Sequence, residues 1–364
     1  MMLSLCKRGE TLEKLRRLRD QFDEQQIDAI LITNPVNRRY ITNFTGSSGI
    51  ALITKKEQFL ITDFRYVEQA KKQAEHFTIV RHERAIEDEI ARLLNTLQLE
   101  RLGFEEEYVT YSQYRTYENL FSIRLVPVKN MIESLRLIKT NEEIQTIKRA
   151  AKIADLAFNH ILNYIKAGVT ELDIATELEY FMRKQGATSS SFTTIVASGW
   201  RSALPHGNAS NKKIQEGELV TLDFGAIYEG YVSDMTRTVA VGKISEELTK
   251  IYNIVKEAQQ RGLDGIKAKM TGKEADALTR EYIQEKGYGE YFGHSTGHGI
   301  GLEVHEGPTL SPRSETILEK NMVVTVEPGI YVPGVGGCRI EDDIVITEDG
   351  NERLTFSTKD LIHL

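Results

Sequence analysis

The chain has 364 residues, which at about 100–200 residues per domain predicts two domains. Its 46 Lys and Arg residues against 53 Asp and Glu residues give a net charge of −7. A net-negative chain without a long basic run is a poor match for a phosphate backbone, so we expect no nucleic-acid partner. No apolar run reaches the roughly 18–20 residues of a membrane-spanning helix, so we expect no membrane partner either.

Cysteine use indicates a reducing compartment. The two cysteines, Cys6 and Cys338, allow one disulfide at most and no disulfide framework. The first ten residues lack the basic and apolar regions of a secretory signal. We therefore expect a cytoplasmic protein in which Cys338 acts as a small hydrophobe rather than as a reactive thiol.

The first part of the chain alternates between strand and helix patterns. Short runs rich in β-branched residues predict strands at 27–33, 50–54 and 59–62. Helical patterns fall at about 64–74, 84–97 and 111–120. This alternation predicts an α/β domain with a mixed or parallel sheet covered by helices.

The second part has longer elements and an α+β texture. Thr140, Thr170 and Thr271 each precede an acidic residue by three positions, which is the pattern of a capping box at a helix start. We expect helices at 141–166, 171–185, 245–266 and 272–286, with strands at about 191–198, 218–241, 322–331 and 339–347. The boundary lies near 130–138, which gives predicted domains at 1–130 and 131–364.

Residues 219–241 read as a β-hairpin that turns at Glu229-Gly230. In that register, opposed residue numbers add up to 459, so Asp223 faces Thr236 and Asp234 is its diagonal neighbour on the same face. Two solvated carboxylates beside a turn would be the simplest interpretation. The apolar neighbours favour a buried hairpin instead, where a proton, a basic group or a metal must neutralise the acids.

A second acidic pair lies on the strands that flank the glycine-rich stretch 333–337. Glu327 precedes this connection and Glu341 follows it. They share a face only if the connection or a bulge contributes an odd number of residues, and the sequence leaves this open. Asp342 and Asp343 come next, and we interpret them as an acidic strand end.

Histidines gather between the two acidic pairs. His294, His298 and His305 lie in a glycine-rich run whose spacing differs from that of the helical zinc-protease motif. His298 and His305 are seven residues apart, so they would face opposite ways in an unbroken strand, and the glycines between them allow a break. His206 lies in a separate Pro-His-Gly loop, which is a weak signal alone.

Four carboxylates and one imidazole suit a pair of hard divalent ions if the groups converge. Oxygen-rich sites favour Mn²⁺-like ions, with Co²⁺ or Zn²⁺ as alternatives. Two such ions about 3.5–4 Å apart generate hydroxide near neutral pH and polarise a carbonyl, which makes amide hydrolysis the natural reaction class.

These motifs resemble those of the pita-bread-fold metallopeptidases, which include aminopeptidase P, prolidase and methionine aminopeptidase, with the metal-free enzyme creatinase as a relative. The ordered candidate ligands and their flanks carry the resemblance: Asp223–Gly225, Ser233–Thr238, Gly297–Gly301, Val326–Gly329 and Arg339–Asp342. The first 130 residues resemble the creatinase/prolidase N-terminal domain more loosely, through 37–46 and 62–66. That domain favours the proline-specific branch, for which the resemblance implies a homodimer.

The resemblance also implies roles for individual residues. Asp223 would hold one metal ion, His298 and Glu327 the other, and Asp234 and Glu341 would bridge them. Glu327 would also transfer the proton of the attacking water to the leaving proline nitrogen. Further roles would fall to residues around this set: His206 and His305 at the scissile carbonyl and its oxyanion, His294 as a substrate-lining residue, and Arg339 steadying a ligand carboxylate.

One departure from the family pattern concerns substrate length. Prolidases often carry an Arg shortly after the His-Glu pair, where it grips the free carboxylate of a dipeptide. Here His305-Glu306 is followed by Gly, Pro and Thr309. This favours an aminopeptidase P-like enzyme that accepts longer peptides; a strict Xaa-Pro dipeptidase, with Arg201 as a substitute, and an inactive or metal-free binding relative are the alternatives.

Overall fold

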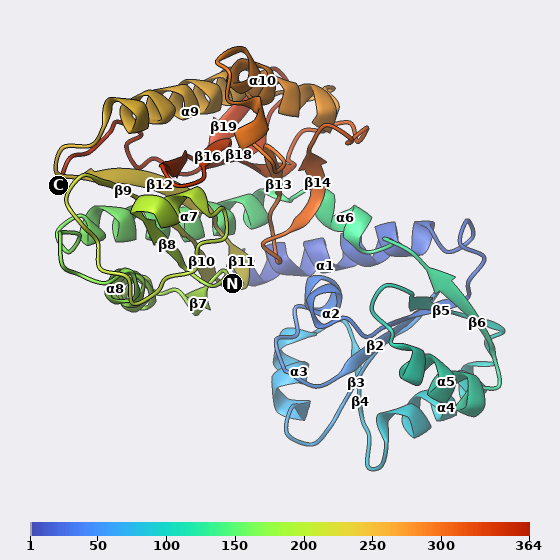
Figure 1. The fold of residues 1–364 in the computed structure, drawn as a ribbon. Coiled ribbons are helices and arrows are strands. Elements are labelled where there is room, and N and C mark those ends of the chain that lie inside the picture. The colour runs from blue at the N-terminus through green and yellow to red at the C-terminus, as the bar shows by residue number, and fades with distance from the viewer. Residues whose placement is uncertain (1) are drawn as a thin grey trace. The chain divides into compact units, whose positions relative to one another are not determined.

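The computed structural model describes residues 2–364, with side chains from Gly9 onward. The chain forms two compact units, Met1–Arg136 and Leu137–Leu364, whereas the sequence placed the division at 130/131. Figure 1 shows the elements of both units. Over the described residues, no helix combines the length and the apolar character that crossing a bilayer requires.

The first unit is built on one mixed six-stranded sheet in the order β4-β3-β2-β1-β5-β6. Strands β1–β2 and β2–β3 pair antiparallel, and the remaining neighbours pair parallel, which confirms a mixed sheet. Its strands are β1 (Ala29–Ile32), β2 (Ile50–Thr54), β3 (Gln58–Thr62), β4 (Thr78–Arg81), β5 (Arg101–Glu105) and β6 (Arg124–Val128). Its helices are α1 (Met2–Asp20), α2 (Pro35–Thr42), α3 (Val67–Gln73), α4 (Ile86–Leu97) and α5 (Tyr111–Leu120), followed by α6 (Glu133–Leu137).

Helix α2 has no counterpart among the helices that the sequence predicted. Asn34 caps it by accepting from the backbone N–H groups of Val36 and Asn37. Pro35 fits the first turn because its missing N–H is not needed there. The start signal was therefore present, but the eight-residue helix is too short for its apolar periodicity to stand out.

Two helix pairs and the strands between them form the second unit. Capping boxes at Thr140, Thr170 and Thr271 start three of the helices, as predicted. The helices are α7 (Asn141–Ile161), α8 (Glu171–Lys184), α9 (Glu246–Gly265) and α10 (Gly272–Glu285), with short 3₁₀ turns η1 (Gly199–Ala203) and η2 (Gly289–Tyr291). Helix α7 ends five residues before the predicted position 166.

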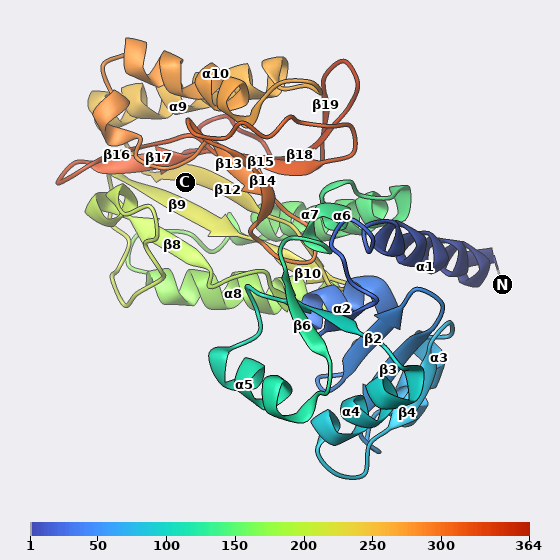
Figure 2. The same cartoon turned by 90° about the vertical axis from the view of Figure 1, so that its right-hand side faces the viewer.

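The strands of this unit lie between the pair α7–α8 on one side and the pair α9–α10 on the other, which Figures 1 and 2 show from two directions. The sheets run β11-β10-β7, β12-β9-β8, β14-β13-β15-β18-β19 and β16-β17. The first strands are β7 (Ser189–Ser190), β8 (Ile195–Ser198), β9 (Glu218–Phe224), β10 (Ala226–Tyr228), β11 (Tyr231–Val232) and β12 (Met235–Val241). The later strands are β13 (Gly297–Gly299), β14 (Glu306–Leu310), β15 (Val323–Val326), β16 (Gly329–Val332), β17 (Gly336–Arg339), β18 (Asp342–Ile346) and β19 (Asn351–Arg353).

The predicted register of the first hairpin is confirmed. Thr236 pairs with Asp223 and Tyr231 with Tyr228, so opposed residue numbers add up to 459 throughout. Glu229 and Gly230 both have positive φ, of 45° and 83°, as a tight two-residue hairpin turn requires. Asp223 is therefore fixed on β9, and Asp234 comes directly before β12.

The second hairpin shows whether Glu327 and Glu341 share a face, which the sequence left open. Val332 pairs with Gly336, so three residues form the connection, which is an odd number. Pairing between β15 and β18 continues the same register. Glu327 and Glu341 thus occupy directly opposed positions and belong to one face of the hairpin.

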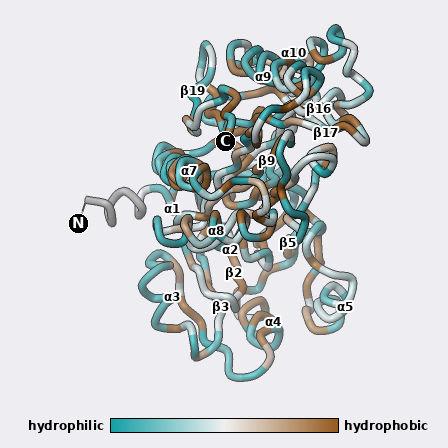
Figure 3. The backbone as a smooth tube through the Cα atoms, turned by 60° about the vertical axis from the view of Figure 1, so that its left-hand side comes forward, coloured by the Kyte–Doolittle hydropathy of each residue, from teal (hydrophilic) through white to brown (hydrophobic). Residues whose placement is uncertain are grey.

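The core of the second unit is apolar and closely packed around the central strands. Side chains of β9 and β12, such as Leu222 and Val239, pack with those of α7 and α8. In Figure 3 the hydrophobic colour gathers on the strands, while helices such as α9 alternate in colour, as amphipathic helices do. Cys338 is a free, buried thiol whose pKa burial raises to about 12, so it is unreactive at neutral pH; the side chain of Cys6 lies outside the described part.

Candidate metal centre

The five candidate ligands come from strands that are far apart in the sequence. Asp223 lies on β9, Asp234 precedes β12, His298 is the middle residue of β13, Glu327 follows β15, and Glu341 precedes β18. All five line one cavity of about 770 Å³ within the second unit. Strand ends and bulges therefore bring together the residues that the sequence analysis selected.

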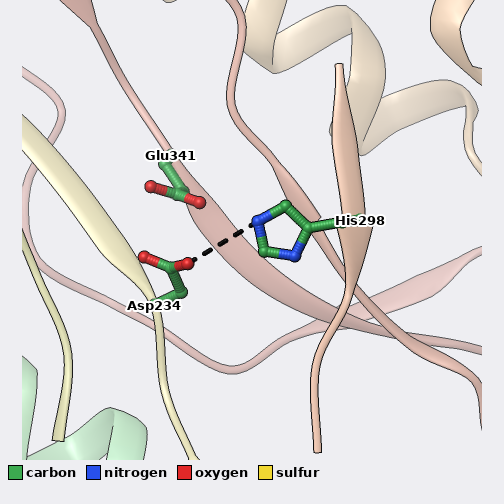
Figure 4. A group of neighbouring side chains, drawn as sticks. All are labelled: Asp234, His298 and Glu341. Atoms are coloured by element: carbon green, nitrogen blue, oxygen red, sulfur yellow. Dashed lines mark ion pairs between the residues drawn. The ribbon is translucent and has the colours of Figure 1, made fainter. Parts of the chain in front are cut away.

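Three of these side chains lie close enough to share one metal ion. Ligand atoms of Asp234, His298 and Glu341 are all within 4.8 Å of one another. Figure 4 shows these side chains pointing toward a common centre. His298 Nε2 lies 3.7 Å from Asp234 Oδ2 and 3.3 Å from Glu327 Oε1, so the fourth ligand adjoins the same ring nitrogen.

The carboxylates are buried next to one another. Burial, then the charges of Glu341 and Asp223, raise the pKa of Asp234 well above its usual value. Burial and the neighbouring acids raise the pKa of Glu341 in the same way, and burial raises the pKa of Glu327 to about 8. Three oxygens in this group have no hydrogen-bond partner among the described residues: Asp223 Oδ1, Asp234 Oδ1 and Glu341 Oε1.

The His298 ring is oriented as a metal ligand would be. Its Nδ1 lies 3.2 Å from the carbonyl oxygen of Gly299, which only accepts, so Nδ1 carries the proton. The unprotonated Nε2 then faces Asp234 and Glu327. Burial, followed by the charge of His305, lowers the pKa of His298 to about 4, which keeps the ring neutral at physiological pH.

Hydroxyl groups hold two of the carboxylates in place. Thr236 Oγ1 donates to Glu341 Oε2 over 2.6 Å. Thr325 Oγ1 donates to Glu327 Oε1 over 3.3 Å and accepts from the backbone N–H of His298 over 3.1 Å. No role at the site was predicted from the sequence for either threonine, although the predicted hairpin register already placed Thr236 opposite Asp223.

Arg339 contacts a ligand carboxylate and three further groups. Its Nη2 donates to Asp223 Oδ2, and its Nε donates to Thr236 Oγ1 over 3.0 Å. Its Nη1 donates to the hydroxyl of Tyr331 over 2.8 Å and to the carbonyl oxygen of Pro205 over 3.1 Å. The guanidinium is almost fully buried, so these contacts compensate its charge and fix its position.

His294 is held by Tyr331, a residue that the sequence analysis missed. The Tyr331 hydroxyl accepts from Arg339, so it donates to His294 Nε2 at 2.8 Å, and His294 Nδ1 donates to the carbonyl oxygen of Ser295. Burial, then Arg339, lower the pKa of His294 to about 4. Tyr331 is four residues beyond Glu327, which is the strand spacing that could have indicated it.

The glycines around His298 break the strand as expected. The register shifts between His298 and Gly299, and His305 lies outside β13. A Cβ atom on Gly299 would lie 2.0 Å from the carbonyl oxygen of Gly307, so a larger residue cannot replace this glycine without displacing the backbone. The rings of His298 and His305 consequently meet edge to face, with centroids 4.4 Å apart, and His206 lines the same cavity.

Next to the ligands lies a second charged group, in which Arg237, Asp342 and Asp343 are buried and Lys359 is partly exposed. Arg237 Nη2 donates to Asp342 Oδ1 over 2.6 Å, and Lys359 Nζ lies 3.2 Å from Asp342 Oδ2. Although burial acts in the opposite direction, these two cations lower the pKa of Asp342. Asp343 Oδ2 accepts from the backbone N–H of Asp234 over 3.0 Å. The two acids start strand β18, but they are fully buried, and Asp343 holds the backbone of the ligand residue Asp234, so they are more than the acidic strand end that was expected.

The donor set fits divalent metal ions. Buried carboxylates that only repel one another destabilise the fold unless a proton or a cation joins them. Unpartnered oxygens and one neutral imidazole nitrogen are the donors that Mn²⁺-like ions take. The arrangement is thus that of a metal centre inside a cavity of the size that small peptides require.

Comparison with known proteins agrees with this geometry. The model of metallopeptidase family M24 matches residues 145–348, and that of the creatinase/prolidase N-terminal domain matches residues 14–138. The chain belongs to metallopeptidase family M24. The expected fold, an α/β N-terminal domain followed by a pita-bread catalytic domain, is therefore confirmed, and so is the expected metallopeptidase class.

Individual relatives of this M24 member match over nearly their whole length. The structure of an Xaa-Pro dipeptidase from Bacillus anthracis is 60% identical, with a TM-score of 0.96, covering 97% of this chain and 100% of that one. An X-Pro aminopeptidase structure from Thermotoga maritima is 44% identical, with a TM-score of 0.89, covering 93% and 98%. The Xaa-Pro dipeptidase of Pyrococcus furiosus is 42% identical, covering 96% and 99%.

Proposed function

We propose that this M24 metallopeptidase hydrolyses the bond between an N-terminal residue and a following proline. The observation that carries the proposal is the convergence of the five candidate ligands in one cavity, where three of their carboxylate oxygens have no hydrogen-bond partner among the described residues. Relatives of both proline-specific kinds, dipeptidases and an aminopeptidase, support the choice of substrate.

We assign the metal ligands as Asp223 for one ion, His298 and Glu327 for the other, and Asp234 and Glu341 between them. Divalent ions bound there, which we propose to be Mn²⁺ with Co²⁺ or Zn²⁺ as alternatives, would polarise the scissile carbonyl and lower the pKa of water. The opposed positions of Glu327 and Glu341 on one hairpin support this ligand assignment.

Side chains around the ligands would handle the peptide itself. Glu327 lines the cavity and adjoins His298, where its carboxylate would take up the proton of the attacking water and pass it to the leaving proline nitrogen. His206 and His305 line the cavity and would bind the carbonyl oxygen as negative charge develops on it. His294, which the hydroxyl of Tyr331 holds in place, would line the bound substrate. Arg339 would orient the carboxylate of Asp223.

Cavity composition favours an enzyme that also accepts peptides longer than two residues. Among the described residues that line the cavity, Arg339 is the one Arg or Lys, and its guanidinium already donates to four groups. Thr309 lines the cavity in the run after His305-Glu306, and this run holds no Arg that could grip a carboxylate. Arg201 does not replace it, because its guanidinium donates to Glu171 and to the carbonyl oxygen of Asn208. We propose that binding does not require a free carboxylate on the proline.

We further propose that the enzyme is cytoplasmic and works as a homodimer. Both proposals come from the sequence: the cysteine pattern for the compartment, and the resemblance to the proline-specific branch for the dimer. Sedimentation of the purified protein tests the second proposal, and a monomer that retains full activity would contradict it.

The test compares three matched peptides with the protein reconstituted in Mn²⁺. Ala-Pro and Ala-Pro-amide differ only in the terminal carboxylate, and Ala-Ala-amide lacks the proline. We expect hydrolysis of both proline peptides with similar kcat/KM and much slower hydrolysis of Ala-Ala-amide. Hydrolysis of Ala-Pro alone would identify a strict dipeptidase, and hydrolysis of none of them would favour a binding protein on this fold.

A further inference from the structure

One buried carboxylate, that of Glu171, binds both ends of the loop that carries His206. Glu171 is the first residue of α8, and its side chain is fully buried. Its Oε1 accepts from the backbone N–H and the hydroxyl of Ser198, over 2.8 and 2.9 Å. Its Oε2 accepts from the backbone N–H and the hydroxyl of Ser210, over 3.2 and 2.7 Å. We call residues 198–210 the His206 loop.

The guanidinium of Arg201, inside the loop, adds to these contacts with Glu171, which together we call the Glu171 clamp. Arg201 Nη1 donates to Glu171 Oε2, and Arg201 Nη2 donates to the carbonyl oxygen of Asn208 over 2.8 Å. Lys212, just beyond the loop, donates to the hydroxyl of Ser198 over 2.8 Å. Hydrogen bonds to charged groups are roughly twice as strong as neutral ones, so Glu171 holds both loop ends more firmly than a neutral side chain would.

Glu171 holds the loop without lining the cavity itself. Pro205, His206 and Asn208 of the loop line the cavity, whereas Glu171 is not among the residues that do. The loop meets the proposed centre through the carbonyl oxygen of Pro205, which accepts from Arg339. Glu171 can therefore affect the rate of hydrolysis only by changing the position of the loop.

We propose that Glu171 is a positioning residue that closes the His206 loop and thereby sets His206 against the substrate carbonyl. The proposal rests on the proposed function only for the role of His206. Without the negative charge, Arg201 loses its ion-pair partner. A glutamine amide keeps one acceptor oxygen, so one of the two backbone N–H groups loses its acceptor, the loop opens and His206 shifts.

The kinetic test is a double-mutant cycle. Glu171→Gln, His206→Ala and the double variant are compared in kcat and KM for Ala-Pro-amide. Glu177→Gln is the matched control, because Glu177 lies on the same helix and contacts His160 instead, over 2.6 Å. We expect Glu171→Gln to lower kcat by about 10- to 100-fold in the wild-type background and to add nothing in the His206→Ala background. An equal loss in both backgrounds would overturn the proposal.

A second readout needs no activity. Trp200 is the single tryptophan of the chain and lies within the loop, 59% exposed, so all tryptophan fluorescence comes from the loop, and its anisotropy responds to the motion of the loop when variants of the same size are compared. We expect lower anisotropy in Glu171→Gln than in the wild type and Glu177→Gln. Ser210→Ala is a milder change that removes one hydroxyl donor to Glu171, so the anisotropy should decrease less. This variant provides the test if Glu171→Gln does not fold.

The kinetic cycle and the Trp200 anisotropy distinguish an effect on the loop from an effect on the reaction. Unchanged Trp200 anisotropy in both loop variants would overturn the clamp, even if their melting temperatures fell. A wild-type protein that cleaves no proline peptide would contradict the proposed function alone, because the fluorescence still decides whether Glu171 holds the loop.

Discussion

Asp234 and Glu341 are buried acids that face each other and other carboxylates. In Asp234→Asn or Glu341→Gln, one member of this repelling group is removed, so we expect hydrolysis to fall by at least about 10³-fold, while the metal-free protein stays folded. Glu348→Gln, at an exposed glutamate, serves as the control and should leave turnover unchanged. Near-normal turnover in either site variant, measured with saturating Mn²⁺, would contradict the proposed bridging roles.

His305 lies against the ring of His298 and lines the cavity. If it donates to the oxygen of the scissile carbonyl as charge develops, His305→Ala should lower kcat by about 10²-fold or more. Steady-state kinetics with Ala-Pro-amide measures this effect. His82→Ala, at a partly exposed histidine of the first unit, is the control. A change confined to KM would argue against an oxyanion role.

Thr309 offers a direct way to change substrate length. Thr309→Arg would place a cation in a cavity where Arg339 is otherwise fully engaged. We expect the variant to favour Ala-Pro over Ala-Pro-amide by about 10-fold relative to wild type, because the new cation can pair with the free carboxylate. Thr309→Gln, a long but neutral side chain, should not change this ratio. An unchanged ratio in Thr309→Arg would mean that the carboxylate binds elsewhere.

At the scale of elements, β12 is joined to β18 and to the C-terminal segment by Arg237. This side chain is 1% exposed and donates to Asp342 and to the carbonyl oxygens of Glu341 and Ser357. Arg237→Met should cost about 3–5 kcal/mol in the free energy of unfolding, because it leaves Asp342 with Lys359 and the more distant Arg353 as its nearest cations. Urea unfolding followed by circular dichroism measures the loss. Arg92→Met, in an exposed pair, should change stability little, and an equally small effect of Arg237→Met would contradict this role.

Local signals predicted a large share of the fold and of the site. The Glu229-Gly230 turn fixed the first hairpin, because two-residue turns set register over short range. The second hairpin could not be decided from sequence, since its register depends on how many residues of the stretch 333–335 stay unpaired. Glu171 looked like an ordinary acidic residue in a first helical turn. Its contacts are 27 to 39 residues away in the chain, so no periodicity indicates them.

For the molecule as a whole, the shifted pKa values predict how pH affects the metal-free protein. The pKa of Glu327 is about 8, and those of Asp234 and Glu341 are raised well above their usual values. The folded state then binds more protons than the unfolded state up to about pH 8, so stability falls as pH rises toward that value. His294 and His298, with pKa values near 4, act in the opposite direction only below about pH 6.5.

We therefore expect the melting temperature of metal-free protein to fall between about pH 6.5 and 8. Bound Mn²⁺ should raise it most at the upper end, because the ions replace the protons on these acids. Glu341→Gln should show a weaker dependence on pH, since one of the shifted acids is gone. Differential scanning calorimetry across this range measures the slope, and a melting temperature that rises with pH would contradict the burial of these acids next to one another.

The proposed function requires the five converging side chains to hold the metal ions that the reaction needs. Titration of Mn²⁺ into metal-free protein, with the rate of Ala-Pro-amide hydrolysis recorded at each step, tests it most directly. We predict no turnover at the start and a rise to a plateau at about two ions per chain. Full turnover without any metal, or no turnover with both ions bound, would contradict it.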